Sequence, residues 1–335
     1  MDTQIQKTAH ALSQKPPARR VVVEFLRAYG AIIGMMLVLL IFQSIKPSFM
    51  SSANVSNVLR QSTILMIMSL GLTVAMALRG VDLSVAQVAD AAGLIAATLI
   101  VNGQPIWMAF VVPLVMALVV GSVNAVLMAY LGVPAIIGTL GMMFVVRSGE
   151  LIYSRGAEPQ ILFTLPRSVT GDFLFLGQGA IGTVPTLIVL AIIMIIIAYT
   201  VMRFTPLGRY INAVGSNVRA AYLAGIDVRR IFASGFIISA VYAAVAGVAL
   251  VSRTGIAVPR GTEPFLLDSF AAVYLGTLAS PQGKMNILGT VIGALFVAFL
   301  GNGLTLMGLG APYRSALNGA FILLAMAIGV LRREN

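Results

Sequence analysis

The chain has 335 residues, of which 59% are hydrophobic and only 10% are charged, and its mean hydropathy is +0.97. Soluble domains carry about 25% charged residues, and one membrane-spanning helix uses about 20 apolar residues. The composition therefore excludes an internal ATPase domain and a nucleic-acid-binding domain, and predicts an all-α membrane protein of about ten transmembrane helices with no soluble domain.

Charge-free stretches predict the membrane spans in chain order, and Gly and Pro turns divide the longest of these stretches. The third predicted span carries Asp90 inside it, and the eighth is short. Residues 154–182 are expected to be polar and irregular. The predicted spans are 28–45, 61–78, a third that starts after Asp82, a fourth and a fifth, and then 184–202, 231–251, 268–279, 286–304 and 313–331, with turns at 103–105 and 132–134 ending the third and the fourth.

Positive residues indicate which side of the membrane each loop occupies, because Lys and Arg are retained on the cytoplasmic side. The basic segment 1–27 is predicted to be a cytoplasmic tail, and an even number of crossings returns residues 332–335 to the same side. In this topology 14 of the 22 Lys and Arg residues are cytoplasmic. Residues 28–331 are then expected to form a single transmembrane domain that crosses the bilayer many times, with 205–230 as a cytoplasmic loop.

Two segments interrupt the apolar pattern. They are 79–84, with the sequence R-G-V-D-L-S, and 276–283, which contains S-P-Q-G, and they occupy comparable positions in the two halves of the chain. Paired interruptions are typical of transporter pathways, because irregular backbone at membrane depth survives only when it is buried in protein or lines water. Ordinary tight turns at the membrane surface are the alternative.

Two acidic residues lie where a carboxylate is costly. Asp82 is in the first interruption, and Asp90 lies in the apolar third span, where a charged group costs about 2.5–3.5 kcal/mol. Asp82 is expected either to line a pathway or to cap the third helix, and Asp90 either to face the pathway or dimer seam or to make a hydrogen bond in packing. Eight helical residues place the two about 80° apart around the axis, so helix geometry does not favour a proton relay between them.

The predicted loop 205–230 has the signature of two short helices. Thr205 and Asn217 are expected to be their N-caps, and Gly215 and Gly225 to end them. Basic residues of this loop are expected to face water, and two small residues to let another protein approach closely. These residues are Arg209, Arg219, Arg229 and Arg230, and Ala220 and Ala221. A loop that touches only lipid headgroups is the alternative.

The sequence has few groups suited to catalysis or metal binding. It has no cysteine, and its one histidine, His10, lies in the polar tail. Residues 177–182, G-Q-G-A-I-G, match the dinucleotide-binding fingerprint, but they lie between a loop and a span rather than in a βαβ unit. The sequence contains neither a P-loop nor H-E-x-x-H. We therefore expect no enzymatic activity of its own, no cofactor and no metal site.

A series of short motifs runs from about Pro47 to Leu331. They are G-V-D-L-S-V at 80–85, T-L-G at 139–141 followed by Arg147, Thr205 with Gly208 and Arg209, G-x-N-x-x-A-A-x-x-x-G-I at 215–226, Ser234-Gly235, Ala246-Gly247, Arg253, Gly261, Leu267-Asp268, Ala271-Ala272, Gly276, Gly289-Thr290 and N-G-L at 302–304. In their order and spacing they resemble the permease subunits of bacterial ABC importers for ribose and related sugars.

The resemblance implies an inner-membrane permease that dimerises with itself or a related permease, binds two ATPase subunits, and receives a monosaccharide from a periplasmic binding protein. It implies that 218–224 is a coupling helix and that the ATPase contacts Thr205, Gly208, Arg209, Asn217, Arg219, Ala220, Ala221, Gly225 and Ile226. Pathway candidates are Asp82, Ser84, Asp90, Asn124 and Asn302, and candidates for docking the binding protein are Arg155, Glu158, Arg260 and Glu263. The alternatives are a proton-coupled secondary transporter that uses Asp82 and Asp90, and a channel-like or purely structural membrane subunit.

Departures from the family pattern concentrate at the two interruptions. Family members usually have glycine where this chain has Ala86, Thr277, Gln282 and Met285, an apolar residue in place of Asp90, and commonly a glutamate in place of Leu266. The departures imply either a different sugar or a permease pair whose other member supplies the missing features. Because charges are scarce in every predicted span except the one with Asp90, we expect a neutral sugar.

Overall fold

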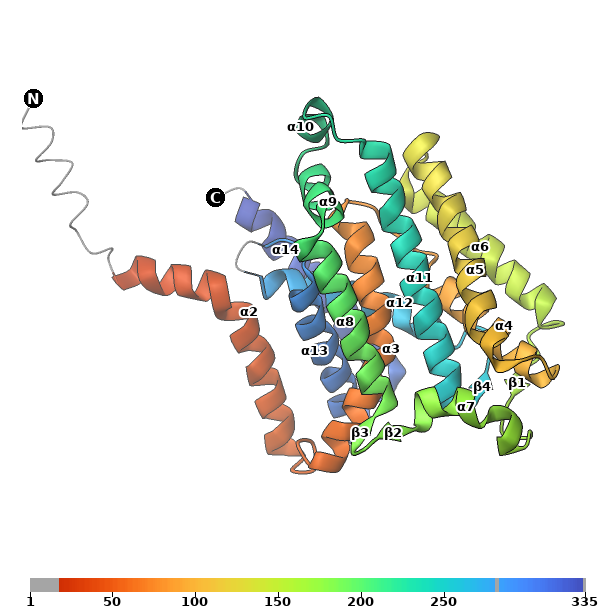
Figure 1. The fold of residues 1–335 in the computed structure, drawn as a ribbon. Helices are drawn as coiled ribbons and strands as arrows, with labels where there is room; N and C mark the ends of the chain where they lie inside the picture. The colour runs from red at the N-terminus through yellow and green to blue at the C-terminus, as the bar shows by residue number, and fades with distance from the viewer. Residues whose placement is uncertain (1–17, 281–282, 334–335) are drawn as a thin grey trace, which may run out of the picture.

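The structure is a computed structural model that describes residues 18–280 and 283–333. The first 17 residues of the predicted tail 1–27, with His10, lie outside the described residues, as do Gln282 and the last two residues of the predicted segment 332–335. The described residues form a helical bundle with two very short antiparallel sheets (Figure 1). The all-α class predicted from composition is confirmed.

The helices follow one another through short connections. They are α2 (Ala18–Ile45), α3 (Ser52–Ala77), α4 (Val85–Val101), α5 (Ile106–Ala125) continued by the π-helix η1 (Val126–Tyr130), α6 (Ala135–Tyr153), α7 (Arg167–Gln178), α8 (Thr186–Phe204), α9 (Pro206–Ser216), α10 (Val218–Leu223), α11 (Val228–Thr254), α12 (Glu263–Leu278), α13 (Ile287–Leu306) and α14 (Ala311–Arg333). The sheets pair β1 (Gln160–Ile161) with β4 (Ile256–Ala257), and β2 (Ala180–Ile181) with β3 (Val184–Pro185).

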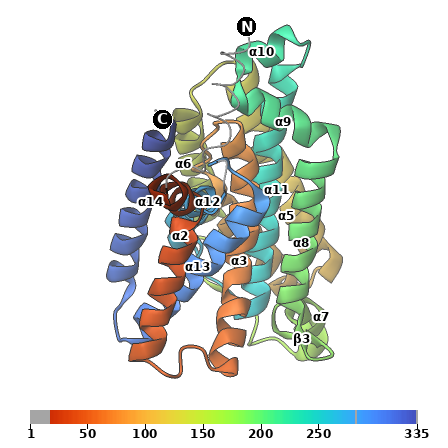
Figure 2. The same ribbon diagram turned by 90° about the vertical axis from the view of Figure 1, so that its left-hand side faces the viewer.

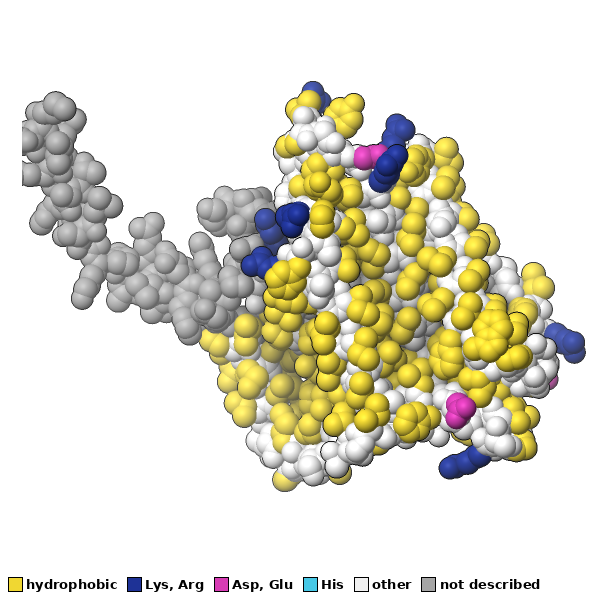
Figure 3. All heavy atoms as spheres, in the orientation of Figure 1, with side chains coloured by type: hydrophobic (Ala, Val, Ile, Leu, Met, Phe, Trp, Pro, Cys, Tyr) yellow, Lys and Arg dark blue, Asp and Glu magenta, His cyan; other side chains and the backbone are white. Residues whose placement is uncertain are grey.

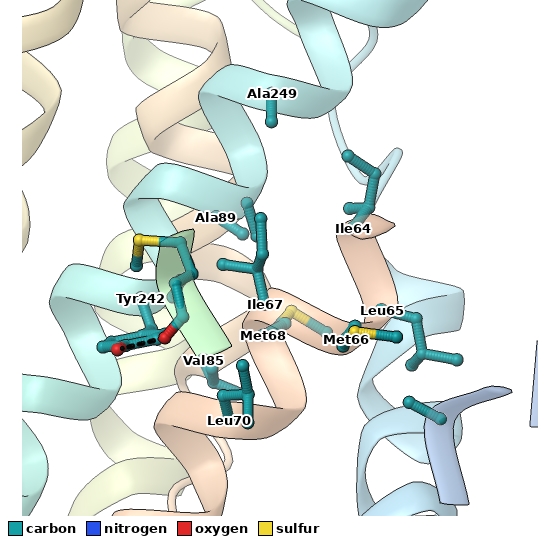
Figure 4. Close-up of a cluster of buried hydrophobic side chains, with 14 of the residues drawn as sticks. Ile64, Leu65, Met66, Ile67, Met68, Leu70, Val85, Ala89, Tyr242 and Ala249 are labelled. Atoms are coloured by element: carbon teal, nitrogen blue, oxygen red, sulfur yellow. Dashed lines mark hydrogen bonds between the residues drawn. The ribbon is translucent and has the colours of Figure 1, made fainter. Parts of the chain in front are cut away.

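Helices α3 and α11 run side by side through the centre of the bundle (Figures 1 and 2). They approach closely at Gly71 of α3, which has no side chain and packs directly against Ser239 and Tyr242 of α11. Small residues allow membrane helices to pack in this way. The apolar core around this contact includes Ile64, Leu65, Ile67, Met68 and Leu70 of α3, Val85 and Ala89 of α4, and Tyr242 and Ala249 of α11 (Figure 4).

The two ends of the bundle carry different elements. Helices α9 and α10 project from one end, and α7 with the two sheets covers the other (Figures 1 and 2). Between the ends, the side of the bundle is covered by apolar side chains, and the charged side chains in that view gather mainly towards the ends (Figure 3). An apolar belt between two polar ends is what a protein in a bilayer requires.

Six of the described helical segments are long and apolar enough to cross a membrane. They are Ser52–Ala77, Ile106–Tyr130, Ala135–Tyr153, Thr186–Phe204, Val228–Thr254 and Ile287–Leu306. Two shorter apolar helices cover residues 32–45 and 85–101.

Several helices extend beyond the predicted spans, because a charge ends a charge-free window but does not end a helix. The second span was predicted to begin at residue 61, whereas α3 begins at Ser52 and extends through Arg60. Its start is set by Ser51, whose side chain accepts a hydrogen bond from the N–H of Asn54 at 3.3 Å.

The charged residues near the fifth and eighth spans also lie inside helices. Helix α6 continues past Arg147 to Tyr153, and α12 begins at Glu263 instead of residue 268. An ion pair of 3.8 Å between Arg147 and Glu263 joins the two helices. The segment 154–182 is also more ordered than predicted, because residues 167–178 form α7, which buries Phe173.

Candidate functional site

The first interruption is held in place by a buried polar cluster around Asp82. The hydroxyl and the N–H of Ser84 both donate to Oδ1 of Asp82, at 2.6 and 3.0 Å, and the hydroxyl of Ser239 on α11 donates to Oδ2 at 2.7 Å. The amide of Asn124 on α5 donates to Ser84 Oγ at 3.0 Å. Asp82 and Ser84 are at most 1% exposed, so this part of the interruption is buried in protein and is not a surface turn.

A second contact ties the interruption to α6. The hydroxyl of Thr139 accepts a hydrogen bond from the N–H of Leu83 at 3.1 Å and lies 3.1 Å from the carbonyl oxygen of Val81. Asp82 does not cap the following helix, because α4 begins at Val85 and the carboxylate bonds Ser84 instead. Three of the predicted pathway residues, Asp82, Ser84 and Asn124, are therefore brought together. Ser239, which the sequence analysis missed, completes their cluster.

Asp90 lies apart from this cluster and faces a small cavity of about 130 Å³. Its Oδ1 accepts a hydrogen bond from the N–H of Thr262 at 2.8 Å, and the side chain of Thr262 donates to the carbonyl of Ala86 at 2.6 Å. Among the residues that the structure describes, Oδ2 of Asp90 has no hydrogen-bond partner, although Asp90 is only 7% exposed. The cavity lies between α4, α11, β4 and the loop 258–262.

Glu150 of α6 is a second buried acid in this region, and the sequence analysis missed it. Its Oε1 accepts a hydrogen bond from the N–H of Arg260 at 3.4 Å, its Oε2 has no partner within the described part of the chain, and the residue is 3% exposed. The signal was available, since Glu150 falls three residues after Arg147, but the fifth span was predicted within the charge-free stretch that ends at Arg147. Asp90 and Glu150 thus both hold the loop before α12.

The residues predicted to dock a binding protein lie near this loop and at the end of α6. Arg260 and Glu263 form an ion pair of 2.8 Å. Arg155 and Glu158 are exposed in the turn after α6, and Arg155 and Arg260 both have positive φ values, of 50° and 69°. The structure thus places one pair of these candidates in contact and the other pair at the surface.

Asn302 is far from the other pathway candidates. It lies on α13 and exchanges two hydrogen bonds, of 2.8 and 3.1 Å, with Asn54 in the first turn of α3. A helix rises 1.5 Å per residue, so Asn54 lies about 35 Å from the end of α3 that leads to Asp82. The pathway candidates therefore occupy three separate places.

The second interruption starts later than predicted. Helix α12 continues through Gly276 to Leu278, and Gly276 packs so closely on Gly289 of α13 that neither has room for a side chain. On the same helix Asp268 is buried and bonded by Arg314 and Asn318 of α14. This ion pair between a buried carboxylate and a half-buried arginine, which the sequence analysis missed, connects α12 to α14.

The two short helices of the predicted coupling loop are confirmed as α9 and α10. Thr205 caps α9 by accepting a hydrogen bond from the N–H of Gly208 at 3.3 Å, and Asn217 caps α10 by accepting one from Ala220 at 3.0 Å. Gly225 has a φ of 80°, so the predicted left-handed residue after α10 is also confirmed.

The exposed face of α10 differs from the prediction. Ala221 is only 5% exposed, so it packs inside its own chain and is not available to a partner. Tyr222 and Leu223 are 71% and 75% exposed instead. Of the other residues predicted to contact a partner, Gly208 is buried, Thr205 and Ile226 are half-buried, and Arg209, Asn217, Arg219, Ala220 and Gly225 are exposed.

Comparisons with known proteins place this architecture in a family. Residues 54–326 match the family model described as "Branched-chain amino acid transport system / permease component". The chain is 33% identical to a ribose import permease of Haemophilus influenzae, covering 90% of this chain and 93% of the relative, and 33% identical to a ribose import permease of Escherichia coli (strain K12), covering 89% and 92%. It is also 29% identical to the D-allose transport system permease of Escherichia coli (strain K12), covering 90% of each chain. No solved structure matches the chain. With a family model over most of its length and relatives at this identity over nearly the whole of both chains, the chain belongs to this family of transport-system permease components.

Proposed function

We propose that the chain is the permease subunit of an ATP-driven importer and that it carries a neutral monosaccharide across the bacterial inner membrane. The observation that carries this proposal is the relationship to sugar permeases over nearly the full length of both chains. It is supported by the scarcity of charged side chains between the two ends of the bundle and by a sequence that contains no P-loop.

The topology belongs to the same proposal. Ten helices cross the membrane, namely α2, α3, α4, α5 with η1, α6, α8, α11, α12, α13 and α14, with both termini cytoplasmic and 28–331 as one membrane domain. The end that carries α9 and α10 faces the cytoplasm, because the connection from α8 to α11 is rich in arginine.

The ATPase subunit binds at α9 and α10 in this proposal. Tyr222 and Leu223 provide an exposed apolar contact at the tip of the bundle, and Arg209 and Arg219 add positive charge beside them. Apolar side chains that protrude into water at the tip of a capped helix are suited to insertion into a groove of a partner.

The sugar-binding protein docks at the opposite end, where Arg155 and Glu158 precede β1, and Arg260 and Glu263 follow β4. A second permease, identical or related, completes the pathway. Asp82, Ser84, Asn124, Asp90 and Asn302 remain candidates for polar groups that the sugar passes.

A proton-coupled carrier is not supported by the relatives or by the contacts of the two acids. Asp82 is bonded by Ser84 and Ser239, whereas Asp90 is bonded by Thr262, so the two carboxylates belong to different clusters. A relay would require them to exchange a proton directly or through a shared group.

Reconstitution tests the proposal. The purified permease, its ATPase subunit and its binding protein are placed in liposomes with ATP held constant, and uptake of radiolabelled monosaccharides is measured with and without a proton uncoupler. We expect uptake that needs ATP and the binding protein and is insensitive to the uncoupler. Uptake that persists without the ATPase subunit and is abolished by the uncoupler would refute the proposal.

A further inference from the structure

Arg79 joins the turn after α3 to the end of α9. Its Nε donates to the carbonyl of Gly215 at 2.9 Å, and its Nη2 donates to the carbonyl of Ser216 at 3.1 Å. The last carbonyls of a helix have no partners within the helix, and positive charge is favourable at that end. The guanidinium of Arg79 is therefore a C-terminal cap supplied to α9 by a residue 136 positions away in the sequence.

The backbone of Arg79 is adapted to this contact. It has a φ of 62°, a left-handed conformation that is unfavourable for a residue other than glycine and persists only where the surroundings fix it. Beside it, the backbone of Gly215 packs directly on the carbonyl of Ala77, leaving no room for a side chain. Ile211 and Val214 of α9 are fully buried. The C-terminal end of α9 thus packs on the C-terminal end of α3, and the hydrogen bonds of Arg79 hold the two ends together.

The residues that follow Arg79 contact helices in the centre of the bundle. Gly80 lies against the ring of Phe236 on α11, with no space for a side chain. Two residues later, Asp82 is bonded by Ser239 of α11 and by Ser84, which in turn is bonded by Asn124 of α5. The segment 79–84 is therefore in direct contact with α9 at one end and with the centre of the bundle at the other.

We propose that Arg79 is a positioning residue through which a displacement of α9 and α10 is transmitted to segment 79–84 and hence to α4, α5 and α11. The proposal rests on the proposed function, in which the ATPase subunit binds α9 and α10. In this proposal the movement of α9 and α10 reaches the bundle by two routes. One is the chain itself, which joins these helices to α8 and α11, and the other is the contact of α9 with the turn between α3 and α4. Arg79 then matters for the use of ATP hydrolysis in transport and not for binding of the ATPase.

The test uses the complete importer in liposomes with Arg79→Gln, which removes the charge and the two-pronged donor. Arg203→Gln is the matched control, because Arg203 is an exposed arginine at the end of α8 whose side chain has no hydrogen bond to any of the described residues. Co-purification of the ATPase, basal ATP hydrolysis, hydrolysis stimulated by the loaded binding protein, and sugar taken up per ATP hydrolysed are measured for each. We expect Arg79→Gln to retain the ATPase and basal hydrolysis while uptake per ATP falls about tenfold, the smallest effect expected from losing one charge-assisted hydrogen bond, and Arg203→Gln to behave as wild type.

Three results would overturn the proposal. Wild-type uptake per ATP in Arg79→Gln would show that Arg79 transmits nothing, and loss of the ATPase subunit would show that Arg79 supports docking instead. If Arg79→Gln does not accumulate in membranes, Arg79→Lys decides, because lysine keeps the charge but lacks the planar fork that holds both carbonyls. Wild-type uptake per ATP in that variant would count against the proposal. A wild-type complex that does not couple ATP hydrolysis to uptake would refute the proposed function instead, so the two failures are distinguishable.

Discussion

The exposed pair at the tip of α10 gives the sharpest prediction about partner binding. Tyr222 and Leu223 are 71% and 75% exposed, although both are large apolar side chains. Full burial of such a side chain contributes about 1.5–3 kcal/mol, so burying the remaining three quarters of each contributes about 1–2 kcal/mol. Replacing both with serine removes about 2 kcal/mol or more of binding free energy, which corresponds to about a 30-fold weaker complex with the ATPase subunit.

The assay is a titration of the ATPase subunit onto the permease in nanodiscs, with hydrolysis stimulated by the loaded binding protein measured in parallel. Ile181→Ser is the matched control, because Ile181 is 57% exposed in β2 at the opposite end of the bundle. We expect the double variant Tyr222→Ser, Leu223→Ser to bind the ATPase about 30-fold more weakly, and Ile181→Ser to bind it normally.

Equal affinity of the double variant and the wild type would refute the reasoning, and residues 206–214 of α9 would then be the better candidate for the docking surface. A large substitution at Ala221 does not serve this test. Because Ala221 is 5% exposed, a tryptophan there would disturb the packing of α10 on its own chain before it reached a partner.

Three further predictions concern the polar and glycine positions. Asp82→Ala should lower the free energy of unfolding of the purified permease by about 1–3 kcal/mol more than Asp82→Asn, because alanine leaves the buried donors around it without an acceptor. Equal melting temperatures of the two variants in a thermal unfolding assay would contradict this. Arg314→Met should destabilise the domain by about 1–3 kcal/mol, because Asp268 loses its charged partner and keeps the hydrogen bond from Asn318, whereas the double variant Arg314→Met, Asp268→Leu should recover part of the loss. Gly225→Val should strain the left-handed turn after α10 and weaken ATPase binding, whereas Gly225→Asn should be tolerated, since asparagine adopts this conformation more readily; equal ATPase retention by the two variants would show that the φ of 80° is not required.

Features that depend on neighbouring residues in the sequence were predictable. The caps at Thr205 and Asn217 and the left-handed Gly225 follow from contacts within one helical turn, and the structure has all three. The helical membrane class follows from composition in the same way. The placement of Asp82, Ser84 and Asn124 together was not specified by any local pattern, although each had been singled out as a polar group in an apolar chain.

Features that depend on long-range pairing were missed or misjudged. Asp90 and Thr262 are 172 residues apart, and Asp82 and Ser239 are 157 apart, so no local period relates them. The fifth span was predicted within the charge-free stretch that ends at Arg147, and the eighth was predicted to begin at residue 268, five residues after Glu263, because hydropathy treats every charge as exposed to water. In the structure Glu150 is bonded and buried, and Arg147 pairs with Glu263, so their helices continue.

The misjudged face of α10 follows from the same limitation. Ala220 and Ala221 were expected to face a partner because small side chains permit close approach, but a helix of six residues has to pack one face on its own chain. Ala221 faces inward because its small side chain lets α10 pack closely on α9 and α11. The same property had suggested that it would face a partner. The face left outward then carries Tyr222 and Leu223, whose large apolar side chains are better suited than alanine to supply binding energy in a groove. Helix α10 therefore packs closely on its own chain with one face and exposes apolar side chains on the other. This arrangement suits it to move as one body with α9, whose C-terminal end is bonded to the turn after α3 by Arg79.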